Sequence, residues 1–536
     1  MNNAPTRFDA AAALIAALRD PRCYPHAVDR IEVLETHISW VILTGLYAYK
    51  IKKPVNLGFL DFATLEQRAA CCHEELRLNR RLAPALYLEV VAITGSPQRP
   101  VVGGDGEALE YAVKMKQFAQ EQLASRLLAS GGLTVHHIGQ LAEKIAVFHQ
   151  YAAVAASGSR FGSPPAIEAQ MEQNFEQIAA LPGAAASRDL LDELRRWSGR
   201  EFIARKTEFA TRQAAARVRE CHGDLHLGNI VLIENEITPF DCIEFSAELR
   251  WNDVASEIAF VVMDLVDRGR ADFAFLFLNR YLESSGDYEA MAVLRFYLVY
   301  RAMVRAKVHC LRAHQFRVGE AERERLLGAF REYLDLAARF THAPAPALVI
   351  LHGLSGSGKS TISCALLQAA CAIRVRSDVE RKRLHQLAAH EHAASGIDTG
   401  IYAGTSTRRV YHRLAQLAHD ILAAGWSVIV DAAFLQRWQR DLLRRVAREL
   451  AVPFVIVSLQ APERVLQQRI AQRSAAGRDA SDADLAVLAH QLASQQPLAA
   501  EEMTEAVVLD ATQSLAALAA LPAWQALVGR IAPKKA

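Results

Sequence analysis

Hydrophobic and polar residues follow two different patterns along this chain, and the pattern changes near residue 347. In the first part, short stretches rich in β-branched and aromatic residues are separated by turn-like breaks, which predicts strands. One longer stretch repeats its apolar residues at helical spacing and ends at Pro84. The predicted strands cover 31–35, 40–45, 46–52, 86–94 and 108–115, and the helix covers 61–84.

The rest of the first part is mainly helical. An Ala-rich helical pattern runs from Phe118 to about Arg219, a short strand-rich block follows over Cys221–Phe245, and a long helical run continues to about Phe340. The stretch Thr341–Ala347 holds two prolines among small residues, and proline blocks both a helix and a strand ladder. It is the predicted linker between a domain over 1–340 and a domain over 348–536.

Beyond the linker, short and nearly continuous apolar runs are separated by amphipathic stretches of helical length. Such runs are typical of strands that are buried on both faces, as in a parallel sheet covered by helices. The second domain is therefore predicted to be an α/β domain with a parallel sheet. The runs are LVILHG (348–353), IRVRSD (373–378), WSVIVDAA (426–433) and PFVIVSL (453–459).

Composition narrows the picture only a little. About half of the 536 residues are apolar, and the formal net charge is +2, so the charge balance requires neither nucleic acid nor an anionic membrane as a partner. The eight cysteines match no zinc spacing and suit a reducing compartment. The first residues lack a basic leader and the longest apolar runs are only strand-length, so we expect a cytoplasmic protein without a membrane segment.

The strongest chemical motif is GLSGSGKS, which fits GxxxxGK[ST] in full between the run LVILH and a predicted helix. Glycines let such a loop wrap so that successive N–H groups point at phosphates, and the following helix adds the positive end of its dipole. Lys359 is expected to reach the β- and γ-phosphates of ATP, and the Ser360 hydroxyl to hold Mg²⁺. The predicted nucleotide-binding residues are Gly353, Ser355, Gly356, Ser357, Gly358, Lys359, Ser360 and Thr361.

Two acids follow the next predicted strands. Asp378 lies just past the end of its strand, where ligands meet an α/β sheet, and could take the proton of an acceptor hydroxyl. Asp431 ends a strand and is predicted to bind the magnesium shell through water. A helix N-cap is the alternative role for either acid, above all for Asp431.

Arginines mark the stretch 464–478. Arg469 and Arg473 are four residues apart, and a mobile segment carrying them could close over the transferred phosphoryl group. A solvated basic face is an equal alternative. The segment from Ala347 to about Ala511 resembles the P-loop kinases of small molecules and nucleic-acid ends, such as gluconate kinase, chloramphenicol phosphotransferase, polynucleotide kinase and zeta toxins. The resemblance implies Asp378 as base and Arg469 or Arg473 as lid arginine, and the absence of an arginine-rich groove favours a small acceptor over a nucleic acid.

A second motif, HGDLHLGN, begins at His222 and is followed by a strand and by Asp241. Phosphoryl transfer in protein kinases uses such an arrangement, in which one carboxylate orients the acceptor while an amide oxygen and a second carboxylate hold Mg²⁺. Asp224 is the predicted base, and Asn229 and Asp241 are the predicted metal ligands. The motif resembles the HGDxxxxN signature of aminoglycoside phosphotransferases and of choline and homoserine kinases, which implies a two-lobed kinase-like α+β fold over about 31–340.

Upstream, YAYK has the spacing of the kinase strand whose lysine clamps the nucleotide, so Lys50 is a candidate and Lys52, on the same face, is another. A charged edge strand is the alternative role for both lysines. The paired acid is expected to be Glu74, Glu75 or Glu66. The first hairpin lacks the GxGxxG loop of protein kinases, so Thr36, His37 and Ser39 would cover the phosphates, and 110–115 would be the hinge that meets adenine.

The combined prediction is a fusion of two MgATP-dependent kinases that act on hydroxyls of small molecules. The fold serves many acceptors, so antibiotic phosphorylation is not implied. Two other hypotheses stay open: one domain catalyses while the other binds nucleotide and regulates, or the P-loop domain is a switch that hydrolyses ATP. A nucleic-acid-end kinase is a further, weaker alternative.

Overall fold

The computed structural model describes residues 7–36, 38–56, 61–314, 318–387, 404–476 and 484–531. By its internal contacts the chain divides into two compact units. Unit 1 comprises Met1–Asp264 and Tyr300–Asp335, and unit 2 comprises Leu265–Val299 and Leu336–Ala536. The sequence boundaries place 265–299 in the first domain, whereas the contacts group this segment with the P-loop part of the chain.

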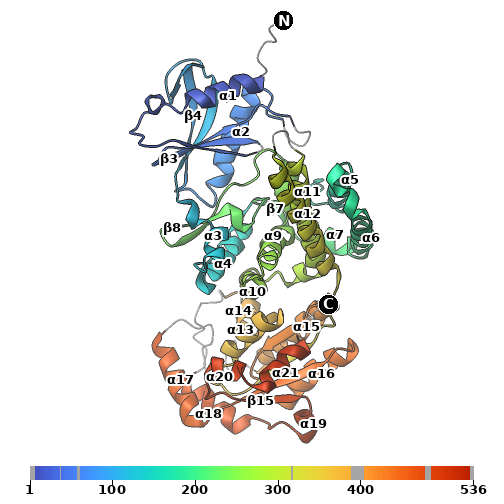
Figure 1. Ribbon diagram of the computed structural model, residues 1–536. Coiled ribbons are helices and arrows are strands. Elements are labelled where there is room, and N and C mark those ends of the chain that lie inside the picture. Colours follow the sequence, from blue (N-terminus) through green and yellow to red (C-terminus); the bar gives the residue numbers. More distant parts are fainter. Residues whose placement is uncertain are drawn as a thin grey trace. The chain divides into compact units, whose positions relative to one another are not determined.

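Unit 1 begins with a six-stranded antiparallel sheet in the order β1-β2-β3-β6-β4-β5 (Figure 1). Side chains alternate between the two faces of a strand. Tyr49 and Ile51 of β3 therefore pack with α1, whereas Ala48 packs with Cys72 of α2 on the other face. The elements are α1 (Arg7–Ala17), β1 (Glu32–Glu35), β2 (Ser39–Leu43), β3 (Tyr47–Lys52), α2 (Leu65–Asn79), β4 (Tyr87–Ser96), β5 (Arg99–Val102) and β6 (Glu110–Lys116).

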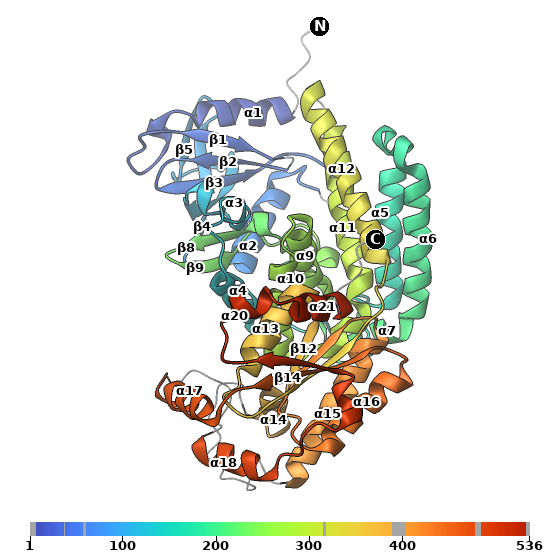
Figure 2. The ribbon, with the colours of Figure 1, turned by 60° about the horizontal axis from the view of Figure 1, so that its bottom comes forward.

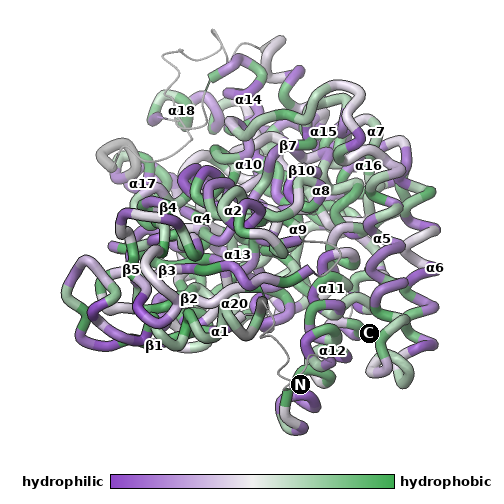
Figure 3. Tube along the Cα trace, turned by 90° about the horizontal axis from the view of Figure 1, so that it is seen from above, coloured by the Kyte–Doolittle hydropathy of each residue, from purple (hydrophilic) through white to green (hydrophobic). Residues whose placement is uncertain are grey.

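The rest of unit 1 is mostly helical, with two small hairpins. Several of these helices have an apolar side, and the change between purple and green along α5 and α6 is clear in Figure 3. The elements are α3 (Ala124–Ala129), α4 (Val135–Tyr151), α5 (Pro164–Ala179), α6 (Arg188–Ala204), α7 (Lys206–Ala214), β7 (Val218–Glu220), β8 (Ile230–Ile233), β9 (Glu236–Pro239), α8 (Ala247–Arg250), β10 (Trp251–Asp253), α9 (Val254–Asp267), α11 (Met291–Ala313) and α12 (Glu320–Thr341), of which α9, α11 and α12 extend into unit 2.

Unit 2 is built on a five-stranded parallel sheet in the order β12-β13-β11-β14-β15. Residues 348–351 of the central strand β11 are fully buried, as a strand covered on both faces requires. Strands β12 and β14 of this sheet are labelled in Figure 2. The elements are α10 (Ala271–Ser285), β11 (Leu348–His352), α13 (Lys359–Ala370), β12 (Ile373–Arg376), α14 (Ser377–Leu384), α15 (Gly404–Ala423), β13 (Val428–Asp431), α16 (Arg437–Glu449), β14 (Phe454–Gln460), α17 (Glu463–Ala476), α18 (Leu485–Ser494), α19 (Ala500–Met503), β15 (Ala506–Asp510), α20 (Leu515–Ala519) and α21 (Pro522–Ile531).

The predicted fold class is confirmed: a two-lobed kinase-like α+β unit is joined to an α/β P-loop unit with a parallel sheet. The ends of helices and strands that the sequence predicts agree less well with the structure. Helix α2 ends at Asn79 rather than at Pro84, because the chain turns there into two short turns before β4. Strands β5 and β15 were not predicted. Within the described part of the chain, no helix is long and apolar enough to cross a membrane.

Candidate active sites

The lysines of β3 meet three acidic groups from two other segments of unit 1, α2 and the stretch after β9. Lys50 and Lys52 lie on the face of the sheet that α2 covers. Lys50 Nζ donates to Glu75 Oε1 at 2.7 Å and also bonds the carboxylate of Asp241. Lys52 donates to Glu75 and to Glu244. Glu75 is therefore the acid that both lysines share.

The two lysines differ in what they can reach. The side chain of Lys52 is fully enclosed between Glu75 and Glu244, and Phe62 lies beneath its ammonium group. Lys50 is slightly exposed and touches Asp241, whose side chain is 38% exposed. Only Lys50 therefore borders a surface that a nucleotide could occupy. Glu74 instead pairs with Arg77 and Arg250.

Attraction between the lysines and the carboxylates of this buried cluster favours their charged forms. Burial would lower the pKa of the Lys50 ammonium, but Asp241 and Glu75 outweigh burial and raise it well above its usual value. Burial would raise the pKa of Glu75, but the two lysines lower it to about 2. Three carboxylates face two ammonium groups here, so the local charge suits a further cation at the exposed carboxylate of Asp241.

Asp241 has an unusual backbone. Its φ of +65° lies in the left-handed region, which is uncommon for a residue other than glycine and often marks a functional site. Two hydrogen bonds hold the strained segment: Asp241 N–H donates to the Tyr87 hydroxyl at 3.2 Å, and Cys242 N–H donates to Asn79 Oδ1 at 2.9 Å. Tyr87 and Asn79 are both buried, so Asp241 is fixed beside Lys50.

The HGDLHLGN loop gathers the other predicted residues. Asn229 Nδ2 donates to Asp224 Oδ2 at 2.9 Å and to the Asp224 carbonyl at 3.0 Å, so the two side chains are adjacent. In this orientation the amide nitrogen of Asn229 faces Asp224, and its oxygen is the atom that could bind a cation. Burial would raise the pKa of Asp224, but His226 and Arg305 hold it well below the usual range. Asp224 is therefore ionised at neutral pH, as an acceptor-orienting base must be.

Histidines hold the loop rather than a metal in this geometry. His222 is fully buried, its Nε2 lies 2.8 Å from the Phe240 carbonyl, and its Nδ1 accepts from Asp224 N–H at 3.3 Å. Burial lowers the pKa of His222, so the ring is neutral. His226 Nδ1 accepts from Gly228 N–H, and its ring packs edge-on against Phe260.

Helix α9 supports this loop with two acids that sequence reasoning missed. Glu257 accepts hydrogen bonds from the backbone N–H groups of His222 and Gly223 at 3.1 and 2.7 Å, and from His149 Nε2 at 2.8 Å. Asp264 accepts from Leu227 N–H at 2.8 Å. The two acids are seven residues apart, hence on one helix face. The sequence did contain a signal for these two residues: acids inside the apolar helix VASEIAFVVMDLVD are expected to be buried, and buried carboxylates need hydrogen-bonding or charged partners.

Thr36 and the predicted hinge 110–115 lie in different parts of the sheet, because Thr36 follows the edge strand β1 whereas the hinge belongs to the inner strand β6. Thr36 Oγ1 accepts from Ser39 N–H at 2.9 Å and closes the turn between β1 and β2. His37 lies outside the described residues. The expected hinge 110–115 lies inside β6, and the chain leaves the sheet after Lys116.

In unit 2, the GLSGSGKS motif forms the loop between β11 and α13 and the first residues of α13. Gly356 and Gly358 have φ of +80° and +87°, which a side chain would strain, and a Cβ on Gly356 would meet the Leu466 carbonyl at 2.8 Å. Lys359 Nζ donates to the carbonyls of Gly353 and Leu354 at 2.9 and 2.8 Å, so it spans the loop. Ser360 and Thr361 are exposed at the start of α13.

The two predicted acids of unit 2 lie after neighbouring strands, because β12 and β13 are adjacent and parallel. Asp431 is buried, and its Oδ2 accepts from Ser363 Oγ at 2.9 Å. Burial raises the pKa of Asp378, as does the nearby Asp431, against the opposing effect of Arg376 and Arg381. A raised pKa suits a group that takes a proton and releases it. The exposed Ser360 hydroxyl and the Asp431 carboxylate are oxygen ligands of the kind that Mg²⁺ prefers.

Of the two predicted lid arginines, Arg469 can be placed. Its Nη2 donates to the Ala511 carbonyl at 2.8 Å and its Nη1 approaches the Gly356 carbonyl at 3.5 Å, so its charge lies beside the P-loop. The side chain of Arg473 lies outside the described residues, although its backbone belongs to α17. The basic groups Arg376 and Arg381, which influence Asp378, were not predicted.

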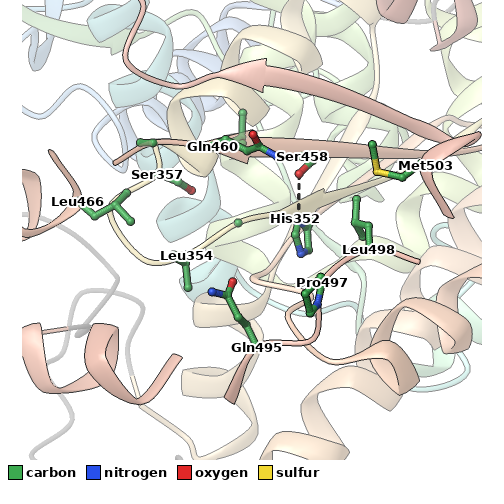
Figure 4. A pocket seen from close by; sticks show the side chains of 13 residues that line it. His352, Leu354, Ser357, Ser458, Gln460, Leu466, Gln495, Pro497, Leu498 and Met503 are labelled. Carbon is green, nitrogen blue, oxygen red and sulfur yellow. Dashed lines mark hydrogen bonds between the residues drawn. The ribbon is translucent and has the colours of Figure 1, made fainter. Parts of the chain in front are cut away.

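A cavity of about 380 Å³ lies beside the P-loop between the ends of β11 and β14 (Figure 4). His352 Nδ1 lies 3.0 Å from Ser458 Oγ, and burial lowers the pKa of His352 to about 4, so the ring is neutral. The described lining holds no acidic or basic side chain apart from this neutral histidine, so the cavity does not suit a triphosphate. Its residues are His352, Gly353, Leu354, Ser357, Ser458, Leu459, Gln460, Ala461, Leu466, Gln495, Pro497, Leu498 and Met503.

Comparison with known proteins gives a match to the P-loop part of the chain and matches over most of its length. Residues 348–498 match a family model described as an AAA domain. Two uncharacterised proteins, from Mycobacterium tuberculosis H37Rv and from Mycobacterium bovis, are each 30% identical over 473 residues, which is 88% of this chain and 92% of theirs. The two-unit chain therefore has full-length relatives.

Solved structures of kinases resemble the two parts separately. A gluconokinase from Sinorhizobium meliloti 1021 is 22% identical and covers 35% of this chain and 95% of its own, with a TM-score of 0.26. Amicoumacin kinase, bound to AMP-PNP and Ca²⁺, is 13% identical and covers 62% of this chain and 94% of its own, with a TM-score of 0.39. At these scores the likeness adds nothing to the geometry above. The AAA match and the geometry of the two sites support a phosphotransferase.

Proposed function

We propose that this chain, which belongs to the family of the mycobacterial proteins described above, is an ATP-dependent phosphotransferase with two nucleotide sites, each of which transfers a γ-phosphoryl group to a hydroxyl of a small molecule. One observation carries the proposal. Each unit contains a lysine and carboxylates of the kinds that bind a metal-bound triphosphate, and the two units have unrelated folds.

In unit 1, Lys50 would bind the phosphates while Glu75 holds it in place. Asn229 and Asp241 would hold Mg²⁺, which when bound neutralises the phosphate charge. Asp224 would orient the acceptor hydroxyl and accept its proton. The support is that Asp224 is adjacent to Asn229 and that Asp241 touches Lys50. The neutral His222 would keep Asp224 in position, because His222 Nδ1 accepts a hydrogen bond from the backbone N–H of Asp224.

In unit 2, the amides of 353–360 would surround the β- and γ-phosphates, with Lys359 reaching across the loop. Ser360 and Asp431 would hold Mg²⁺, and Asp378 would accept the proton of the hydroxyl. Arg469, and Arg473 from the same helix, would neutralise charge on the transferred group. The support is the arginine beside the P-loop and the raised pKa of Asp378.

Separate disabling of the two sites tests this proposal. Asp224→Ala and Lys359→Ala are each incubated with γ-labelled ATP and a metabolite extract, with Glu176→Gln, an exposed position on α5, as the control. We expect each variant to lose a different set of labelled products and the control to lose none. If Lys359→Ala keeps every labelled product, unit 2 is a regulatory nucleotide site instead. If its only effect is a lower release of phosphate in the absence of an acceptor, unit 2 is a hydrolytic switch.

A further inference from the structure

Helix α10 covers the β12 edge of the parallel sheet of unit 2. Strand β12 is the edge strand, and its unpaired backbone groups need partners. Asn279 supplies them: its Nδ2 donates to the Ala372 carbonyl at 3.0 Å and its Oδ1 accepts from Arg374 N–H at 2.6 Å. Asn279 is buried, so α10 is a structural part of this sheet although it precedes the P-loop by some eighty residues.

One turn farther along α10, a buried carboxylate binds the side chain of the same strand residue. Glu283 Oε1 accepts from Arg374 Nε at 2.9 Å and from Arg374 Nη2 at 2.6 Å. The third nitrogen of this guanidinium points to α13, where Nη1 donates to Ser363 Oγ at 3.1 Å and approaches the Ser360 carbonyl at 3.4 Å. Arg374 thereby joins α10 to the first turns of the P-loop helix.

The same chain of bonds ends on the predicted magnesium carboxylate. Ser363 Oγ donates to Asp431 Oδ2 at 2.9 Å. A second arginine, Arg376, stands between the two acids, with its Nη1 3.8 Å from Glu283 Oε2 and its Nε 4.0 Å from Asp431 Oδ2. Glu283 and Asp431 are therefore linked in two ways, through Arg376, which lies near both acids, and through Arg374 and Ser363.

We propose that Glu283 is a positioning residue for the metal site of the P-loop: it holds Arg374 and Arg376 and so keeps the Asp431 carboxylate available for a divalent cation. This inference rests on the proposed function of unit 2. The physical reason is competition for charge. A buried guanidinium needs an anionic partner, and without Glu283 the two arginines would be drawn more strongly to the other acids near them, of which Asp431 lies 4.0 Å from Arg376. An Asp431 paired with arginine would attract a cation less, and its orientation through Ser363 would be lost.

The test measures the magnesium dependence of nucleotide binding in the full chain. Binding of a fluorescent ATP analogue is titrated with Mg²⁺, and the signal of the P-loop site is the part that Lys359→Ala removes. Glu283→Gln keeps the shape and removes the charge. We expect it to raise the Mg²⁺ concentration for half-maximal binding by about three- to tenfold, the size of one ordinary hydrogen bond, with unchanged binding in the absence of Mg²⁺. Asp272→Asn, on the same helix but with a side chain 38% exposed, is the matched control and should bind as the wild type does.

Ser363→Ala is a second variant, because Glu283→Gln removes a buried charge and could impair folding. It removes the hydroxyl that joins Arg374 to Asp431 but leaves both charges in place. We expect a shift in Mg²⁺ dependence in the same direction, and a melting curve shows that each variant is folded at the temperature of the assay. If both variants bind with wild-type Mg²⁺ dependence while Lys359→Ala removes the signal, the positioning role is refuted and the P-loop site stands. If the wild type shows no signal that depends on Lys359, the proposed function of unit 2 fails instead.

Discussion

The carboxylate of Glu257 should be the largest single contributor to the stability of the catalytic loop of unit 1. It is fully buried, and three donors hold it, two of them backbone N–H groups of His222 and Gly223. Burial would raise its pKa, but the His149 hydrogen bond and the loop amides lower it from 4.5 to about 2. A shift of this size corresponds to roughly 3 kcal/mol of stability at neutral pH.

The sign follows from the direction of this shift. Because the folded pKa of Glu257 is depressed, its contribution is fully present above the unfolded value of about 4.5 and is lost as the pH falls toward 2. Glu257→Gln imitates the protonated acid. We therefore expect the variant to unfold on the order of 5–10 °C earlier at pH 7, and the difference from the wild type to shrink as the pH falls from 5 toward 3.

Scanning calorimetry at a series of pH values measures this difference, and it separates transitions if the two units melt independently. Glu176→Gln, which removes an exposed carboxylate from the same unit, should show no shift. A Glu257→Gln variant that melts with the wild type at pH 7, or a difference that does not change with pH, would refute the electrostatic role of Glu257.

Three further predictions address the sites themselves. Lys50→Met should raise the ATP concentration needed by unit 1 far more than Lys52→Met does. Lys52→Met should mainly lower the melting temperature, because it leaves Glu75 and Glu244 buried with one cation fewer. Equal effects of the two variants on ATP binding would contradict the assignment of Lys50 as the phosphate-binding lysine. Phosphoryl transfer by unit 2 should fall as the pH drops through the pKa of Asp378, which is raised above the ordinary value of about 3.9. Asp378→Asn should abolish both the transfer and its pH dependence. Measuring the transfer rate against pH, with and without the substitution, tests this prediction. Arg469→Ala should weaken ATP binding by about tenfold, as the loss of one charge contact beside the P-loop predicts, and unchanged affinity in a fluorescence titration would count against a nucleotide role.

Local motifs were the part of this protein that the sequence predicted well. The P-loop has its strand, loop and helix within 23 consecutive residues, so neighbouring residues determine the geometry. The HGDLHLGN loop is similar, because Asn229 and Asp224 are only five residues apart. The strand pattern also placed Lys50 and Lys52 on one face, since the side-chain period of a strand is two.

Long-range contacts account for what the sequence left open. The choice between Lys50 and Lys52 depends on Asp241 and Glu244, which are about 190 residues away in the chain. The predicted division of the chain near residue 340 followed the prolines of the linker. Segment 265–299 nevertheless belongs to unit 2, and side chains such as Asn279 join it to the parallel sheet. No local pattern encodes either pairing, although the buried acids of α9 and α10 are a general sign of such partners.

The number of MgATP molecules bound per chain tests the central claim most directly. Equilibrium dialysis of the wild type with a non-hydrolysable ATP analogue and Mg²⁺ should give two, and Lys359→Ala and Asp241→Asn should each give one. A wild-type value of one, or the loss of all binding in either single variant, would contradict the account of two independent nucleotide sites.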